Sequence, residues 1–120
     1  MAKRILVVED DQDILYLIEF LLTQEGYEVI TSLTGLGIVE QIENEHPDLI
    51  LLDIMLPGID GRDICRDIKR NAKTKEIPVV MMSAHVDISR TIRDVGADDF
   101  IAKPFDIYNL LGRIERQLIA

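Results

Sequence analysis

The sequence has few of the features that mark secreted, membrane or nucleic-acid-binding proteins. It contains one cysteine, Cys65, so no internal disulfide can form, and it has no tryptophan. No apolar run approaches the roughly 20 residues that cross a bilayer, and the N-terminus lacks the apolar region of a signal peptide. Basic residues number 13 against 22 acidic ones, and the net charge of −9 argues against direct binding of nucleic acid or anionic lipid. These absences predict a cytoplasmic protein without a membrane segment.

The length and composition indicate one folded domain that spans residues 1–120. The chain has 120 residues, which suffice for a single hydrophobic core but not for two. Apolar residues make up 48% of it and there is no low-complexity run, so we expect it to fold rather than to remain disordered.

Short apolar segments alternate along the chain with amphipathic ones. Leu49–Leu52 is a continuous apolar run, which is typical of a strand buried on both faces of a parallel sheet. Strands are predicted at residues 4–8, 27–31, 49–52, 77–82 and 100–102, and helices are predicted to start near Asp13, Thr34, Asp60, Ile88 and Ile107. This alternation predicts an α/β fold with a doubly wound, five-stranded parallel sheet. We expect a (βα)5 flavodoxin-like sandwich, because its strand order 2-1-3-4-5 would bring the ends of the first and third strands together.

Polar residues follow the predicted strands at the points where they end. Asp10 and Asp11 follow the first strand, Asp53 the third, Ser83 the fourth and Lys103 the fifth. Ligands bind at this edge of open α/β sheets, and three carboxylates brought together there need a cation. Oxygen ligands without histidine or cysteine favour Mg²⁺ over Zn²⁺. A lysine and a hydroxyl nearby suit a phosphoryl group, and an aspartate can act as its nucleophile.

These residues lie in motifs that resemble a known family, the receiver domain of two-component response regulators (the CheY-like superfamily). The resemblance runs from Ile5 to Leu118. It rests on four motifs in order: Glu9-Asp10-Asp11, Asp53-Ile54-Met55-Leu56-Pro57-Gly58-Ile59-Asp60-Gly61, Ser83-Ala84, and Gly96-Ala97-Asp98-Asp99-Phe100-Ile101-Ala102-Lys103-Pro104-Phe105.

The resemblance implies a role for each site residue. Asp53 would be the phosphoacceptor, and Ser83 and Lys103 would contact the phosphoryl oxygens. Mg²⁺, for which Mn²⁺ can substitute, would have four protein ligands: Asp10, Asp11, Asp53 and the main-chain carbonyl of Met55. The Lys103–Pro104 peptide bond is expected to be cis. The domain would catalyse only its own phosphorylation and dephosphorylation and is not expected to be an enzyme in any wider sense.

The resemblance also implies partners and a switch. The phosphoryl donor would be a sensor histidine kinase or a phosphotransfer protein. Ser83 and Phe100 would respond to phosphorylation and alter the surface of the fourth helix, fifth strand and fifth helix. That surface would bind a partner or form a homodimer through charges of both signs: Arg90, Arg93, Asp98, Asp99, Arg113 and Arg116. Met55 and His85 would tune the rate of dephosphorylation.

Other interpretations of these residues remain open or are disfavoured. An aspartate-nucleophile phosphohydrolase needs a second aspartate two residues after the nucleophile, where this chain has Met55. A flavodoxin-like electron carrier would cradle phosphate after the first strand, where Glu9-Asp10-Asp11 would repel it. Cys65 is expected to be a core thiol, and His85 can also be read as an exposed loop residue. The sequence names neither the kinase nor the oligomeric state, and it does not tell a stand-alone receiver from part of a longer regulator.

Overall fold

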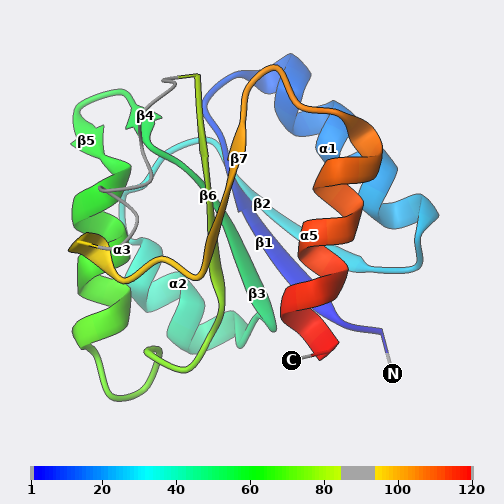
Figure 1. The fold of residues 1–120 in the computed structure, drawn as a ribbon. Helices are drawn as coiled ribbons and strands as arrows, with labels where there is room; N and C mark the ends of the chain where they lie inside the picture. Colours follow the sequence, from blue (N-terminus) through cyan, green and yellow to red (C-terminus); the bar gives the residue numbers. More distant parts are fainter. Residues whose placement is uncertain (1, 85–93, 120) are drawn as a thin grey trace.

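A computed structural model describes residues 2–84 and 94–119, which form a three-layer α/β sandwich (Figure 1). The sheet has five parallel strands: β1 (Arg4–Val8), β2 (Glu28–Ser32), β3 (Leu49–Asp53), β6 (Val79–Ser83) and β7 (Asp99–Ala102). They lie in the order β2-β1-β3-β6-β7. Counted along the chain within this sheet, that is the predicted order 2-1-3-4-5, so the predicted fold class is confirmed.

Among the helices that the structure describes in full, two pack on each face of the sheet. On one face, alternate strand residues such as Leu6 and Ile50 pack against α2 (Ile38–Glu45) and α3 (Gly61–Arg70). On the other, residues such as Val7 and Leu51 pack against α1 (Gln12–Gln24) and α5 (Ile107–Ile119). All five residues of β3 are buried, as expected for a central strand covered on both sides.

Three local features differ from the expectations. Helix α1, predicted to start near Asp13, starts at Gln12, and the Asp11 side chain caps it by accepting from the backbone N–H groups of Asp13 and Ile14. The second helix starts at Ile38 rather than near Thr34, because Gly37 at φ +67° stands as its N-cap. A two-stranded antiparallel hairpin, β4 (Met55–Leu56) and β5 (Ile59–Asp60), occupies the segment where Pro57-Gly58 indicated only a turn.

Some predicted features fall at the limits of the described chain. Of the predicted helix from Ile88 to Val95, only Asp94 and Val95 are described, and both are helical. His85 lies outside the described residues. Cys65 is fully buried on α3, which confirms the prediction of a core thiol. Over residues 2–84 and 94–119, no helix has the length and apolar character needed to cross a membrane.

Candidate functional site

The register of the parallel sheet brings the polar strand ends to one edge. Val8 pairs with Leu52 between β1 and β3, and Ser83 pairs with Ala102 between β6 and β7. Glu9 and Asp10, which follow β1, therefore lie at the same edge of the sheet as Asp53 at the end of β3. Lys103 follows β7 and lies directly beside Ser83. A backbone hydrogen bond of 2.8 Å from Lys103 N to the Ser83 carbonyl oxygen holds the last two strand ends together.

Lys103 links two of the carboxylates. Its Nζ lies 2.6 Å from Oε2 of Glu9 and 3.1 Å from Oδ2 of Asp53. Both carboxylates are buried, with Glu9 1% and Asp53 3% exposed. Burial alone would lower the pKa of the lysine, but the hydrogen bonds to Glu9 and Asp53 outweigh it and raise that pKa. The ammonium is therefore held charged beside Asp53.

Glu9 is the carboxylate most affected by its surroundings. Burial raises the pKa of Glu9 to about 7, and the nearby Asp53 charge acts in the same direction. The hydrogen bonds from Lys103 and from the Asp11 backbone N–H lower it, but they do not offset the burial. The charged form of a carboxylate with such a pKa is strongly stabilised by any additional positive charge placed next to it.

Three carboxylates form a cluster suited to a divalent cation. One oxygen each of Glu9, Asp10 and Asp53 lies within 4.8 Å of the others, and Asp10 is open to solvent. An all-oxygen, acidic donor set fits a hard ion such as Mg²⁺. Asp11, one of the predicted ligands, is not in this cluster, since its Oδ1 accepts hydrogen bonds at 3.0 and 3.2 Å from the α1 backbone.

The structure therefore favours Glu9-Asp10 over the predicted pair Asp10-Asp11 as the acidic pair of the site. Glu9 belongs to the motif Glu9-Asp10-Asp11 but was not predicted to be a site residue. The signal for Glu9 is that it is the first polar residue after the apolar run of β1, but two further acids follow it directly. Asp11 is excluded by the start of α1, which was predicted near Asp13 but lies at Gln12, with Asp11 as the N-cap.

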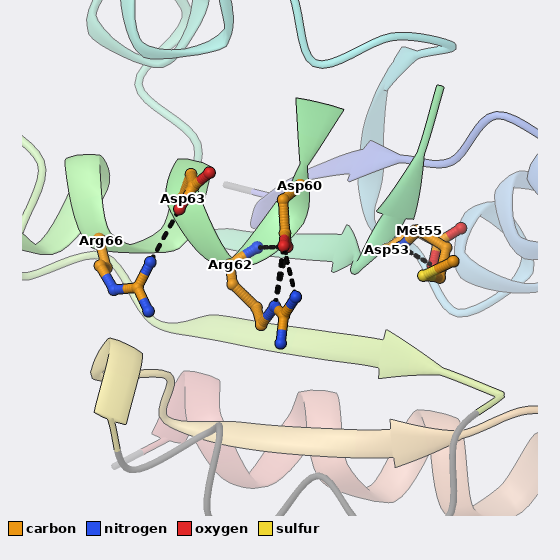
Figure 2. A network of polar contacts seen from close by, with 6 residues as sticks. All are labelled: Asp53, Met55, Asp60, Arg62, Asp63 and Arg66. Carbon is orange, nitrogen blue, oxygen red and sulfur yellow. Dashed lines mark hydrogen bonds and ion pairs between the residues drawn. The ribbon is translucent and has the colours of Figure 1, made fainter. Parts of the chain in front are cut away.

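The segment after Asp53 is held in a fixed conformation. The Asp53 side chain accepts a hydrogen bond at 3.2 Å from the Met55 backbone N–H (Figure 2). Met55 then pairs with Asp60 in the β4–β5 hairpin, and its side chain is 60% exposed. Asp60 caps α3 and accepts from Nε of Arg62 at 2.9 Å, and this contact lowers the pKa of Asp60 (Figure 2).

Gly61 allows the start of α3 to press against the end of β3. Its backbone N–H donates to the Ile54 carbonyl oxygen at 2.8 Å. A Cβ atom at this position would lie 2.2 Å from the Asp53 carbonyl oxygen and 2.8 Å from the Ile54 Cα. Only glycine fits this approach of one backbone to another, so Gly61 helps to fix the main chain at Asp53.

The remaining predicted residues take the following places. Ser83 is fully buried at the end of β6, next to the strand of Lys103. Phe100 is half-buried on β7, opposite Met81, and packs on the core beneath α2 and α3. The Lys103–Pro104 peptide bond is cis, as the resemblance implied.

Two acidic residues of the predicted output surface already have partners within the chain. Asp98 Oδ2 accepts from Lys69 Nζ at 2.7 Å and from the Val79 backbone N–H at 2.8 Å. Asp99 Oδ1 accepts from Arg113 at 2.6 Å. A homodimer that used these carboxylates would have to replace or share the intramolecular contacts.

Comparison with known proteins gives the family. Residues 5–115 match the response regulator receiver domain family. A CheY-like receiver domain protein from Methanospirillum hungatei is 32% identical, with a TM-score of 0.91 over 99% of this chain and 95% of that one. NtrX from Brucella abortus is 40% identical, with a TM-score of 0.88 over 99% of this chain and 27% of that one.

A third relative is the receiver domain of a sensor histidine kinase from Pseudomonas aeruginosa, with magnesium coordinated in its active-site cleft. It is 27% identical, and the TM-score is 0.87 over 100% of both chains. The family match, the strand order and the polar edge agree with one another, and the chain belongs to the response regulator receiver domain family.

Proposed function

We propose that this receiver domain accepts a phosphoryl group on Asp53 from a sensor histidine kinase or a phosphotransfer protein of a two-component system. The observation that carries the proposal is the position of Lys103 Nζ, 3.1 Å from the Asp53 carboxylate and next to an acidic cluster. In the transfer, an Asp53 oxygen bonds to phosphorus as the bond between phosphorus and the donor's histidine nitrogen breaks. That nitrogen keeps the electron pair and takes up a proton.

The chain's own residues suit this reaction. The Lys103 ammonium, held charged by its two carboxylate partners, neutralises charge on the phosphoryl oxygens, and the Ser83 hydroxyl donates a hydrogen bond to one of them. Glu9, Asp10, Asp53 and the main-chain carbonyl of Met55 would hold Mg²⁺, with Mn²⁺ as a substitute. The cation supplies further neutralisation of the transferring group.

An apolar pocket beside Lys103 supports docking of a donor protein. Its volume is about 190 Å³, and it is lined by Ile14 and Leu17 of α1 together with Lys103, Pro104 and Phe105. Large exposed apolar side chains continue along α1 at Tyr16 and Phe20. Exposed apolar surface next to a reactive group is typical of a protein-binding site, so we assign donor docking to this face.

The output is proposed to follow from Ser83 and Phe100. A phosphoryl group on Asp53 would draw the Ser83 hydroxyl toward it, and Phe100 would move inward from its half-buried position. The surface of the fourth helix, β7 and α5 would change as a result. Homodimer formation through that surface stays a prediction, as does the tuning of phosphoryl lifetime by Met55 and His85.

Phosphorylation with a small donor tests the proposed reaction. The protein is incubated with acetyl phosphate and Mg²⁺, and its intact mass should increase by one phosphoryl group that hydroxylamine removes. Omission of the cation should abolish the gain, as should Asp53→Asn, which keeps the size of the side chain. If Asp53→Asn gains the group to the same extent as wild type, the assignment of Asp53 is wrong.

A further inference from the structure

A second surface feature lies away from the phosphorylation site, between α2 and α3. It is a groove of about 350 Å³ bounded by the loop before α2, the first turn of α2, β5 and the outer side of α3. Its floor is apolar and consists of Ile38, Val39, Ile59 and Ile64, which belong to the core or pack on its edge. Leu36 stands at the rim with 74% of its surface exposed. We refer to this feature as the α2–α3 groove.

The walls of the α2–α3 groove carry charge of one sign. Glu40, Asp63 and Asp67 line it, and no lysine or arginine of the described chain does. Asp63 is paired with Arg66 at 2.8 Å (Figure 2). Over residues 2–84 and 94–119, neither Glu40 nor Asp67 has an ion-pair partner within 4 Å. Within the described residues, the groove therefore presents two carboxylates without an ion-pair partner above an apolar floor.

The loop that forms one side of the α2–α3 groove is closely fitted to α3. A Cβ atom at Gly35 would lie 2.4 Å from Cδ1 of Ile64, so the glycine lets the loop backbone approach the helix. Gly37, at φ +67°, then turns the chain into α2. Leu36 lies between these two glycines and is exposed to solvent.

We propose that the α2–α3 groove binds a basic amphipathic segment of a partner protein. An aliphatic side chain of that segment enters the groove and contacts Leu36, Ile59 and Ile64, and a neighbouring lysine or arginine pairs with Glu40 and Asp67. Charge complementarity selects this occupant, since an acidic segment, a nucleic acid or an anionic membrane would be repelled. The net charge of −9 also favours the approach of a basic partner. The groove would make the receiver a two-faced binding module, whatever the fate of the proposed phosphorylation.

Titration with a designed peptide tests the proposal. The probe is a short peptide blocked at both ends, with two leucines four positions apart and lysines around them. In ¹⁵N–¹H NMR spectra of the ¹⁵N-labelled protein, millimolar probe should shift the backbone amides of residues 36–40 and 59–67. A probe with serine in place of the leucines, and one with glutamate in place of the lysines, should each leave these amides unmoved.

Variants with matched charge separate the groove from the overall charge of the protein. Glu40→Gln combined with Asp67→Asn should weaken probe binding at least tenfold, and so should Leu36→Ser. Glu25→Gln combined with Glu115→Gln removes the same number of charges from exposed positions near α1 and on α5, and it should change binding less than twofold. Because all substituted side chains are exposed, each variant should keep the wild-type thermal midpoint within about 4 °C.

Several outcomes would overturn the proposal. These are no shifts at millimolar probe, shifts centred outside the groove, equal weakening in both charge variants, or equal binding of the serine probe. Sedimentation of the free protein tests a second copy of this chain as the occupant. If the protein dimerises and Leu36→Ser abolishes the dimer, the groove is a self-association site and not the docking site proposed here.

Discussion

Lys103 and Glu9 form an ion pair with 2.6 Å between Nζ and Oε2, in which the carboxylate side chain is 1% exposed. The same ammonium also contacts Asp53. Without a further cation, one ammonium is therefore shared by two buried carboxylates, and the pKa of Glu9 rises to about 7 as a consequence of its burial. The site is thus short of positive charge, and this has measurable effects on stability and on metal binding.

The first prediction concerns the pH dependence of stability in the absence of divalent cations. The pKa of Glu9 is about 7 in the folded protein against 4.5 in an unfolded chain, so the folded state binds an extra proton between these values. The contribution of protonated Glu9 to the free energy of unfolding is complete below pH 4.5. It is lost as pH rises toward 7, by up to about 1.4 kcal/mol per pH unit. Urea unfolding in EDTA across this range should show that the free energy of unfolding falls more steeply with pH in wild type than in Glu9→Gln, which has no proton to lose at this position. Equal slopes in the two proteins would contradict it.

The second prediction separates Asp10 from Asp11. Mg²⁺ should stabilise the wild-type fold by mass action, by about 2.7 kcal/mol at a hundredfold excess over its dissociation constant. Asp10→Asn should lose this response in thermal melts. Asp11→Asn should keep it, because the Asp11 side chain caps α1 and asparagine caps a helix about as well.

Asp11→Ala provides the control for the cap. It should cost about 1 kcal/mol of stability and still respond to Mg²⁺. If Asp11→Asn loses the Mg²⁺ response and Asp10→Asn retains it, then the original sequence assignment of Asp11 as a ligand is the better one, and the cluster around Glu9 has another role.

The sequence predicts the sheet and most of the site for a physical reason. A buried parallel strand has to be apolar on both faces, so the strand at Leu49–Leu52 can be predicted from the sequence alone. The first polar residue after such a strand marks its carboxyl end, and short crossovers place all of these ends at one edge. Asp10, Asp53 and Lys103 could therefore be grouped in advance.

What could not be predicted depends on exact register and on contacts distant in sequence. Asp11 does not join the acidic cluster because its side chain caps α1, and the N-cap of a helix cannot be placed to within one or two residues from the hydrophobic pattern. The hydrogen bond from Lys69 to Asp98 joins residues 29 positions apart, and the sequence pattern does not show it. Asp98 was therefore predicted to be available for pairing across a dimer.

The third prediction concerns Cys65, whose thiol is fully buried on α3. Burial raises the pKa of this thiol to about 11, so almost none of it is thiolate at pH 8. Modification by a disulfide reagent at pH 8 should be roughly 100-fold slower or more in the folded protein than in urea. Rapid, complete modification under native conditions would show that this face of α3 opens readily.

The last prediction tests whether the contact of Gly61 with the end of β3 matters for the site. Gly61→Ala places a methyl group within 3 Å of the backbone at Asp53 and Ile54, and neither backbone can move without displacing the buried strand β3. We expect a loss of about 1–3 kcal/mol in urea unfolding, together with slower phosphorylation by acetyl phosphate, because the Asp53 main chain has to shift. Gly112→Ala is the matched control, since a Cβ there meets nothing within 4 Å on α5, and alanine should stabilise the helix by about 0.5–1 kcal/mol. The effect on phosphorylation should be absent in that control. If Gly61→Ala is as stable and as readily phosphorylated as wild type, the start of α3 is free to retreat and does not hold Asp53 in place.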